Sequence, residues 1–266
     1  MKPFNTQRVP TGTLFLCLIV LLGSLSPALA NTVSCSSNAV KQEALVSWVY
    51  DGDTVRLNDE RKIRLIGINT PEMRREDRVA QPLAADAREY LLAQLKAFDN
   101  RVLLLHGPEI KDHYGRSLAH LFLPDGTNLQ AQLLEKGFAS SIAFPPNLQF
   151  ADCYRRAEKQ AQAEKLGIWQ HPYFAPKKST QLPSRFKGYT HITGKVKRIA
   201  RSSKSIWINL EGRVALRVAK KDLHLFADVD FDQLEGQTIS AHGWFYPYKR
   251  KTTLRLRHPS ALTILP

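Results

Sequence analysis

Three short segments of the sequence carry polar side chains that the packing of a hydrophobic core does not require. Asp51 and Asp53 flank Gly52, which permits a tight turn, and Asn69 begins a second polar segment at the end of an apolar strand. The third segment, residues 112–116, turns at a glycine and ends in an arginine. If the intervening strands close, Asp53 and Asn69 come together. Their oxygens suit a hard divalent cation, Ca²⁺ best because it tolerates irregular geometry.

The elements that would position these segments follow from the hydrophobic pattern. Three apolar or alternating runs precede a segment in which apolar residues recur every three or four positions, the period of a helix. Two strands and two helices follow, and glycines at 137 and 167 suit the left-handed residue that ends a helix. Five short strands with a helix after the third fit a small, partly open Greek-key barrel. The predicted strands are residues 44–50, 54–57, 62–68, 101–105 and 117–123, and the predicted helices are residues 81–98, 128–136 and 150–166.

A second β-rich unit is expected after a linker. Residues 172–187 contain three prolines and no apolar period, so they predict a linker between domains at 31–171 and 188–266. The second unit resembles an oligonucleotide-binding (OB) barrel in size and strand order. The fold class is therefore mainly β with α (α+β), a five-stranded OB-type Greek-key barrel with helices followed by a second small OB-like barrel. The later strands are predicted at 189–199, 205–210, 213–218, 238–246, 252–256 and 261–265, with a short helix at 223–234.

The first thirty residues have the three parts of an export signal. Lys2 and Arg8 precede an apolar run at 14–25, and Ala30 ends a small-residue cleavage site. The run is too short and too early for a membrane span, although a retained N-terminal anchor is the alternative. We expect cleavage near Ala30, a mature chain that begins near Asn31, no stable membrane anchor, and a periplasmic or secreted product.

Two cysteines remain once the expected signal, which contains Cys17, is removed. Cys35 lies in the N-terminal tail and Cys153 in a predicted helix. Disulfides persist outside the cytoplasm, so an even pair suggests one bridge between these residues. Two unpaired thiols are the alternative.

The charge of the chain is concentrated in its last third. Residues 177–266 contain eighteen Lys and Arg against six Asp and Glu, a net charge of +12, whereas the whole chain carries +14. A strongly basic segment favours an anionic polymer or an anionic membrane surface. No amphipathic basic helix is evident, which makes the membrane surface the weaker interpretation.

Aromatic residues alternate with these cations in two stretches, 195–207 and 244–258. Cations can follow a phosphate backbone while aromatic rings stack on bases, so the second unit is predicted to hold nucleic acid. A solvated barrel surface with core tryptophans is the structural alternative, and nothing indicates an obligate protein partner. The candidate substrate-binding residues are Lys195, Lys197, Arg198, Trp244, Tyr246, Lys249 and Arg250, and Trp207 and Tyr248 are further stacking candidates.

Four strings in the first half of the chain identify a family resemblance. They are DGDT at 51–54, RLIGINTPE at 64–72, DHYGRSLA at 112–119 and EKLGIW at 164–169. In this order and approximate spacing, residues 44–170 resemble the thermonuclease, or staphylococcal-nuclease-like, family. The resemblance implies a five-stranded OB barrel that cleaves the phosphodiester bonds of DNA and RNA with Ca²⁺.

The resemblance also implies a set of metal ligands. Asp53 matches a metal-binding carboxylate, Thr70 the residue that gives a backbone carbonyl to the metal, and Asp51 a supporting carboxylate. The family's pattern has a second metal-binding aspartate where this chain has Asn69, whose amide oxygen can coordinate with one negative charge fewer. Weaker Ca²⁺ binding is the expected consequence, and loss of activity is the alternative.

The remaining matched residues would act on the phosphate. Glu72 resembles the candidate general base, Arg64 and Arg116 the phosphate-gripping arginines, and Tyr114 an aromatic next to the nucleotide. A cation and two guanidinium groups lower the barrier of phosphodiester hydrolysis because negative charge builds on the phosphoryl oxygens. Removing either arginine should reduce turnover more than folding. Base preference does not transfer, since residues 140–147 lack the tyrosines that the family often has there.

Structural alternatives exist for these residues as well. The acidic residues could be turn and cap residues, Arg64 could neutralise Asp53 in a salt bridge, and Tyr114 could be a packing aromatic. Two functional classes therefore follow: an exported Ca²⁺-dependent nuclease, and a nucleic-acid-binding protein whose nuclease-like barrel has lost turnover. A general base at Glu72 favours the enzyme, because binding alone does not need one.

Overall fold

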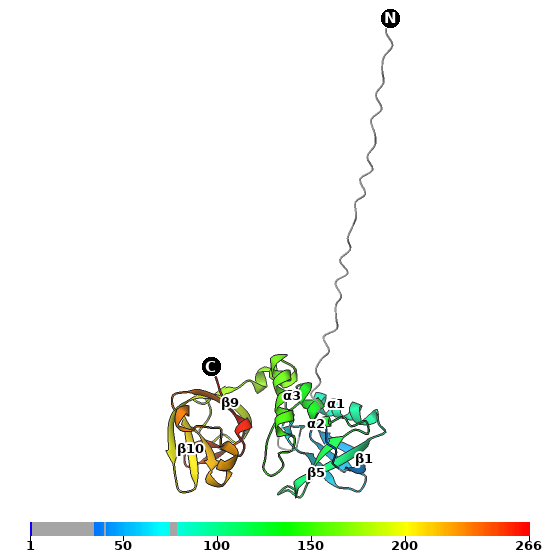
Figure 1. Ribbon diagram of the computed structural model, residues 1–266, viewed down its shortest axis with the longest axis horizontal. Coiled ribbons are helices and arrows are strands. Elements are labelled where there is room, and N and C mark those ends of the chain that lie inside the picture. Colours follow the sequence, from blue (N-terminus) through cyan, green and yellow to red (C-terminus); the bar gives the residue numbers. More distant parts are fainter. Residues whose placement is uncertain (2–34, 40, 75–78) are drawn as a thin grey trace. The chain divides into compact units, whose positions relative to one another are not determined.

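The computed structural model describes residue 1 and residues 35–39, 41–74 and 79–266 (Figure 1). The chain divides into two units, Met1–Thr32 and Val33–Pro266, and the description below concerns the second. The export signal predicted at residues 1–30 lies, apart from Met1, outside the described residues. In the part of the chain that is described, no helix combines the length and the apolar character that crossing a membrane requires.

A closed five-stranded barrel forms the first half of this unit. Its strands are β1 (Gln42–Asp51), β2 (Thr54–Leu57), β3 (Lys62–Leu65), β5 (Arg101–Lys111) and β6 (Ser117–Phe122). They close in the order β1-β2-β3-β6-β5, with the first three antiparallel and β3 parallel to β6. The predicted barrel of the first domain is confirmed.

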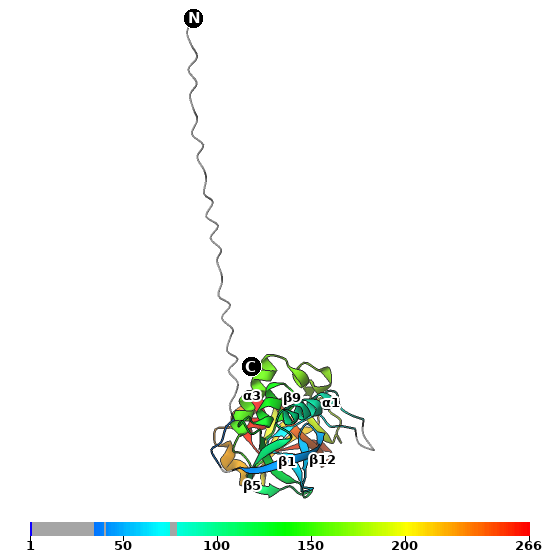
Figure 2. The ribbon, with the colours of Figure 1, turned by 90° about the vertical axis from the view of Figure 1, so that its right-hand side faces the viewer.

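Three helices accompany this barrel: α1 (Ala84–Lys96), α2 (Leu129–Glu135) and α3 (Ala151–Ala163). Asn128 begins α2 because its side-chain oxygen accepts a hydrogen bond from the backbone N–H of Ala131 at 3.0 Å. α1 packs against β1, and α2 packs against β6 and α3 (Figures 1 and 2). The helices thus fix the strand ends from which the polar segments emerge.

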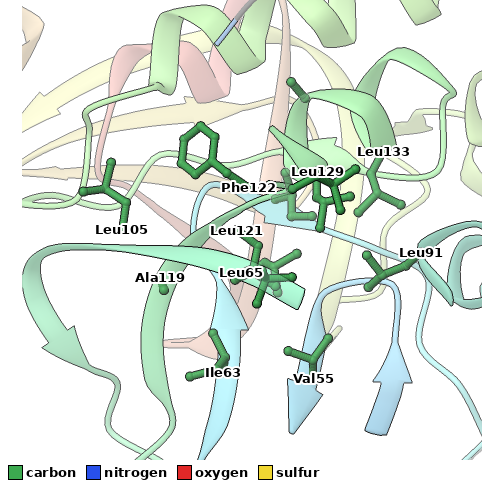
Figure 3. Packing of buried hydrophobic residues seen from close by; sticks show 14 of the residues in the cluster. Val55, Ile63, Leu65, Leu91, Leu105, Ala119, Leu121, Phe122, Leu129 and Leu133 are labelled. Carbon is green, nitrogen blue, oxygen red and sulfur yellow. The ribbon is translucent and has the colours of Figure 1, made fainter. Parts of the chain in front are cut away.

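The core of the first barrel lies between the inner faces of the strands and the apolar sides of α1 and α2. Figure 3 shows Leu91 of α1 and Leu133 of α2 in one cluster with strand residues such as Val55, all of them fully buried. Burial of such side chains contributes about 1.5–3 kcal/mol each. A rigid barrel is therefore available to hold charged groups at its rim.

A disulfide joins Cys35 to Cys153, with their Cα atoms 5.8 Å apart. It ties the start of the described chain to α3, 118 residues later. The side-chain amide of Asn128 donates to the carbonyl of Cys35 at 3.1 Å, which connects the same tail to α2. The tail is therefore part of the first barrel's packing.

The second half of the unit is another closed barrel, as the predicted fold class requires. The strands of the ring are β9 (Gly188–Arg201), β10 (Ser205–Leu210), β11 (Val214–Ala219), β12 (Thr238–Tyr248) and β13 (Lys251–Leu256), and β14 (Leu262–Ile264) pairs with β12 beside it. Pairing of β12 with β9 closes it, and β11 runs parallel to β13. A separate apolar core fills this barrel, with Ile208, Leu216 and Ile239 fully buried.

Several short elements differ from the predicted ones. The predicted strand 62–68 ends at Leu65, and β4 (Ile68–Asn69) pairs instead with β7 (Ser140–Ser141). The predicted linker contains the 3-10 helix η2 (Pro172–Phe174) and β8 (Lys177–Lys178), and β8 joins the sheet of the second barrel beside β9. The predicted helix at 223–234 is replaced by two 3-10 segments, η3 (Lys220–Phe226) and η4 (Asp232–Leu234). The remaining short elements are η1 (Gly167–Trp169) and η5 (Pro259–Ala261).

Candidate active site

The turn between β1 and β2 presents two buried carboxylates. The backbone N–H of Asp53 donates to Asp51 Oδ1 at 3.1 Å, which fixes the turn around Gly52. A Cβ at Gly52 would lie 2.8 Å from Thr70 Cγ2, so the close approach of Thr70 requires a glycine here. The two carboxyl groups are 6% and 4% exposed and therefore lie largely out of water.

Asp53 connects three parts of the chain. Its Oδ2 accepts the backbone N–H of Thr70 at 2.9 Å, and the Arg64 guanidinium lies 3.0 Å from the same oxygen. Its Oδ1 accepts the Thr54 hydroxyl at 3.0 Å. Strand register causes this convergence, since Thr54 of β2 is paired with Arg64 of β3. The structure therefore brings together Asp51, Asp53, Arg64 and Thr70.

The electrostatics of this cluster favour an added positive charge. Burial, and then the negative charge of Asp53, raise the pKa of Asp51 from 3.8 to about 7, although a hydrogen bond from the Asp53 backbone and the charge of Arg64 oppose the rise. Thr70 Oγ1 is buried and has no hydrogen-bond partner within the described chain. Two carboxylates with a neutral oxygen beside them fit a hard divalent cation. No group of three or more His, Cys, Asp and Glu residues converges in the described part, so neutral oxygens and water must complete any ligand set.

Arg116 and Tyr114 lie in the turn before β6. Arg116 Nε donates to Asp112 Oδ2 at 2.8 Å, and Asp112 Oδ1 accepts the backbone N–H groups of both Tyr114 and Arg116 at 2.9 Å. The Arg116 guanidinium lies 5.5 Å from the centre of the Tyr114 ring, which is 74% exposed. β6 runs beside β3, and Leu118 is paired with Arg64. The second arginine thus lies directly before the strand that neighbours the first arginine's strand, two residues before the partner of Arg64.

Glu72 is positioned through its backbone. Its N–H donates to Gln81 Oε1 and its carbonyl accepts the Gln81 N–H, both at 2.9 Å. Gln81 comes just before α1, so the helix start anchors the residue. Neither Gln81 nor Asp112 was predicted as a site residue. The spacing of Asp112 four residues before Arg116 is a signal that the sequence does contain, whereas nothing in the sequence pairs Gln81 with Glu72 across the intervening loop.

Comparisons with known proteins show which family the chain is similar to. The profile of the family described as "Staphylococcal nuclease homologue" matches residues 62–171. The thermonuclease of Staphylococcus intermedius is 30% identical over 169 residues, which cover 62% of this chain and 99% of that protein. The chain belongs to the staphylococcal nuclease family. The thermonuclease of Staphylococcus hyicus is 32% identical over 139 residues (51% of this chain, 80% of that protein), and endonuclease YncB of Bacillus subtilis is 30% identical over 123 residues (45% and 57%). These relatives support a nuclease.

Only some of the candidate site residues lie within the stretch that matches the profile of the staphylococcal nuclease family. Arg64, Thr70, Glu72 and Arg116 lie within residues 62–171, whereas Asp51 and Asp53 precede that stretch. The assignments of these residues to metal, base and phosphate roles stay predictions, for which the cluster around Asp53 provides geometric support. The salt bridge between Arg64 and Asp53, which is the structural alternative, is observed as well, with the guanidinium 3.0 Å from Asp53 Oδ2.

Asn69, the departure from the pattern of the staphylococcal nuclease family, lies in β4 opposite Ser140 of β7. β7 is held by Glu158 of α3, whose carboxylate accepts the Ser141 N–H at 2.8 Å and the Ser141 hydroxyl at 2.6 Å. Burial raises the pKa of Glu158 from 4.5 to about 7. The pairing of β4 with β7 therefore fixes the backbone of Asn69. The next residue, Thr70, donates its N–H to Asp53 and so belongs to the carboxylate cluster.

The predicted substrate-binding residues of the second barrel lie on two regions of it. Lys195, Lys197 and Arg198 are exposed along β9, whereas Lys249 and Arg250 form the turn between β12 and β13. Trp244 of β12 packs against Tyr189 at 4.9 Å and against Phe144 of the first barrel at 5.7 Å, measured between ring centroids. Tyr246, half-buried, lies two residues further along β12. The sequence-predicted set is thus not one continuous patch.

Proposed function

We propose that this protein is an exported, Ca²⁺-dependent nuclease that hydrolyses phosphodiester bonds of DNA, RNA or both. The single observation that supports it best is the convergence of Asp51, Asp53, Arg64 and Thr70 at the rim of a barrel of the staphylococcal nuclease family. The names of its relatives, thermonuclease and endonuclease, support the same reaction class.

In this proposal the metal is held by Asp53, by the carbonyl of Thr70 and by the amide oxygen of Asn69, with Asp51 beside it. When bound, Ca²⁺ supplies positive charge next to the phosphoryl oxygens and orders water near the phosphorus. The buried carboxylates favour this ion because a bound cation offsets the burial, and then the negative charge of Asp53, that raise the pKa of Asp51.

The protein's own groups then complete the reaction. Glu72 accepts a proton from the water whose oxygen attacks phosphorus, and Arg64 and Arg116 donate hydrogen bonds to the phosphoryl oxygens as charge develops. One P–O ester bond breaks in the same reaction, and the departing oxygen takes a proton from solvent. Arginine stays protonated at working pH, so both act as clamps and not as proton donors. Arg64 bonds Asp53 in this structure, so gripping a phosphate requires its guanidinium to share that carboxylate or leave it.

A catalytically weakened nucleic-acid-binding protein is the second candidate, and Asn69 is the observation that favours it. One carboxylate fewer reduces the attraction for Ca²⁺. The two candidates differ in turnover and not in binding.

Incubation of plasmid and heat-denatured DNA or RNA with the purified full-length protein tests the proposal. We expect degradation with Ca²⁺, none with chelator, and a loss of about 10²–10⁴-fold in Glu72→Gln, the usual contribution of a general base. Glu89→Gln, on α1, is the matched control and should degrade DNA at the parent rate. Equal degradation in all reactions would remove the mechanism, and binding without degradation would favour the second candidate.

Export is a separate part of the proposal. The disulfide between Cys35 and Cys153 supports an oxidising compartment, where such bonds persist. Expression of the full chain in a bacterium followed by mass spectrometry of the periplasmic and medium fractions should find a product that begins near Asn31. A full-length product confined to the cytoplasm would contradict it.

A further inference from the structure

The second barrel has a basic surface cavity that none of the family's motifs includes. It has a volume of about 410 Å³ and lies where the turn after β9 meets β11, η3 and β13. Five of its seven lining residues are cationic and none is acidic: Lys204, Arg217, Lys220, Lys221 and Arg255. Such a concentration of positive charge around a concave surface favours phosphate groups.

Two of these cations are held against each other by the fold. Arg217 of β11 and Arg255 of β13 are direct neighbours in the parallel strand pair. Arg217 Nε donates to Ser205 Oγ at 2.8 Å, and Arg255 forms an ion pair with Asp222 at 2.8 Å. Within the described chain, the buried Nε of Arg255 has no hydrogen-bond partner. Like charges on neighbouring strands destabilise a sheet; Asp222 offsets part of this cost at Arg255, and an anion bound between the two arginines would offset more of it.

An aromatic row begins at the wall of the cavity. The Arg217 guanidinium lies 5.7 Å from the centre of the Trp207 ring, and Trp207 stacks on Tyr248 with ring centroids 5.7 Å apart and planes 13° from parallel. Tyr248 is 43% exposed, and Lys249 Nζ lies 5.6 Å from its ring. Because Arg217 belongs to both the cavity and the row, phosphate-binding and stacking groups are adjacent.

The turn that follows Tyr248 places cations at conformationally unfavourable positions. Lys249 and Arg250 are the two residues between the last paired residues of β12 and β13, and their φ angles are 42° and 62°. Two-residue turns of this kind prefer Asn-Gly, because side chains such as lysine and arginine are strained at positive φ. The chain retains two cations here despite that cost, next to the exposed ring.

We infer that this face, composed of the basic cavity, the Trp207–Tyr248 pair and the Lys249–Arg250 turn, binds a single strand of nucleic acid, with phosphates in the cavity and a base on Tyr248. The inference rests on the proposed function for the identity of the polymer. A single strand is favoured over a duplex because only unpaired bases expose their faces for stacking. An anionic bilayer would attract the same cations, and the vesicle measurement described below distinguishes it from a strand. Lys195 and Lys197 of the sequence-predicted surface do not line this cavity.

Binding is tested with full-length protein that carries Glu72→Gln, in chelator, so that the strand stays intact. The probe is a fluorescently labelled single-stranded oligonucleotide of about 16 nucleotides, titrated at several salt concentrations. Lys220→Gln with Lys221→Gln, both exposed, should weaken binding about tenfold at low salt and lower the slope of log K against log salt by about 1.4. Tyr248→Ala should weaken binding about tenfold without changing that slope.

The matched control is Lys195→Gln with Lys197→Gln, which removes the same charge from exposed positions on β9. It should weaken binding less than the cavity variants. Cavity variants that bind as the parent does, or a control that loses as much, would overturn the inference. The last measurement is binding of the parent and the cavity variants to anionic phospholipid vesicles. Cavity variants that lose vesicle binding but keep strand binding would also overturn it, in favour of a membrane surface.

Turnover of the same cavity variants without Glu72→Gln separates this inference from the proposed function. Absent Ca²⁺-dependent cleavage by the parent protein, together with impaired strand binding in the cavity variants, would remove the nuclease and leave the binding face. Normal cleavage together with unchanged strand binding would remove the binding face and leave the nuclease.

Discussion

The two arginines of the candidate active site have different environments, and removing them should have different costs. The Arg64–Asp53 pair is buried, with side-chain exposures of 10% and 6%, whereas Arg116 is 27% exposed beside Asp112. Arg64→Ala leaves a buried carboxylate unpaired and should reduce the free energy of unfolding by ~3–5 kcal/mol. Arg116→Ala should change it by less than ~1 kcal/mol. Both should lose turnover, measured beside urea unfolding at the same pH.

Arg64→Lys is the control for this comparison, because it keeps the charge near Asp53 and loses the planar fork. Stability close to that of the parent with impaired turnover is expected. Equal destabilisation by the two alanine variants would contradict the difference in environment. For Arg64 we therefore expect a loss of folding stability in addition to the loss of turnover.

Asn69 offers a second prediction at the scale of one residue. Asn69→Asp supplies the carboxylate of the family's pattern, so the Ca²⁺ concentration for half-maximal activity should fall by about tenfold. The metal-free variant should be less stable than the parent, because a third carboxylate joins Asp51 and Asp53. Activity and thermal unfolding are measured across a Ca²⁺ titration.

Asn69→Ala separates loss of the amide oxygen from gain of charge. It should need more Ca²⁺ than the parent if the amide coordinates. Identical Ca²⁺ dependence in the parent, the aspartate and the alanine variants would place residue 69 outside the metal site.

At the scale of elements, the turn between β12 and β13 has two cationic residues at positions where glycine or asparagine would be less strained. Lys249→Asn with Arg250→Gly places residues suited to positive φ at both positions, so the free energy of unfolding should rise by ~1 kcal/mol. Affinity for the single-stranded probe should fall in the same variant, since two cations leave. The comparison uses urea unfolding and oligonucleotide titration.

Asn58→Gly, in the turn between β2 and β3, is a control for an added turn glycine away from this face. It should leave strand affinity at the parent value. A Lys249–Arg250 variant that is no more stable than the parent would show that the turn carries no strain.

Most longer elements were predictable because burial imposes a period on them. The alternation of buried and more exposed residues along β12 and the helical spacing of α1 both give such a signal. β4, β7 and β8 have two residues each, too few to show any period. Residues that face each other on paired strands could not be predicted from the sequence for another reason. Arg217 and Arg255 meet only through the parallel pairing of β11 with β13, which no local pattern specifies.

The candidate active site was more accessible to sequence reasoning than the basic cavity. Asp51 and Asp53 share one turn, so their proximity is a local property. Arg64 lies near Asp53 because β2 and β3 pair antiparallel. Thr70 reaches Asp53 because the chain turns back after β3. The predicted order of strands allows both. The anchoring of Glu72 by Gln81 depends on how the chain enters α1, and this path has no sequence signature.

At the scale of the whole molecule, polar contacts join the two barrels within one unit. His191 Nε2 lies 3.2 Å from Ser140 Oγ, and His242 Nε2 lies 3.2 Å from the Ser141 carbonyl. The two imidazole rings stack with centroids 5.0 Å apart. β7 therefore links β4, next to the candidate metal site, with strands β9 and β12 of the second barrel.

This junction makes stability depend on pH in two opposite ways. Burial lowers the pKa of His191 to about 3 and that of His242 to about 4, from 6.5, so their contribution to stability is lost as pH falls below 6.5. Burial raises the pKa of Glu158 to about 7, so its contribution to stability is complete below pH 4.5 and is lost as pH rises through 7.

His242→Gln should reduce the loss of unfolding free energy between pH 6.5 and 4 by ~1–2 kcal/mol, and Glu158→Gln should reduce the loss of unfolding free energy between pH 4.5 and 7. Urea unfolding from pH 4 to 8 measures both, with His224→Gln, an exposed histidine, as the control. Parallel profiles for the parent and both junction variants would mean that these groups titrate alike in the folded and unfolded chains.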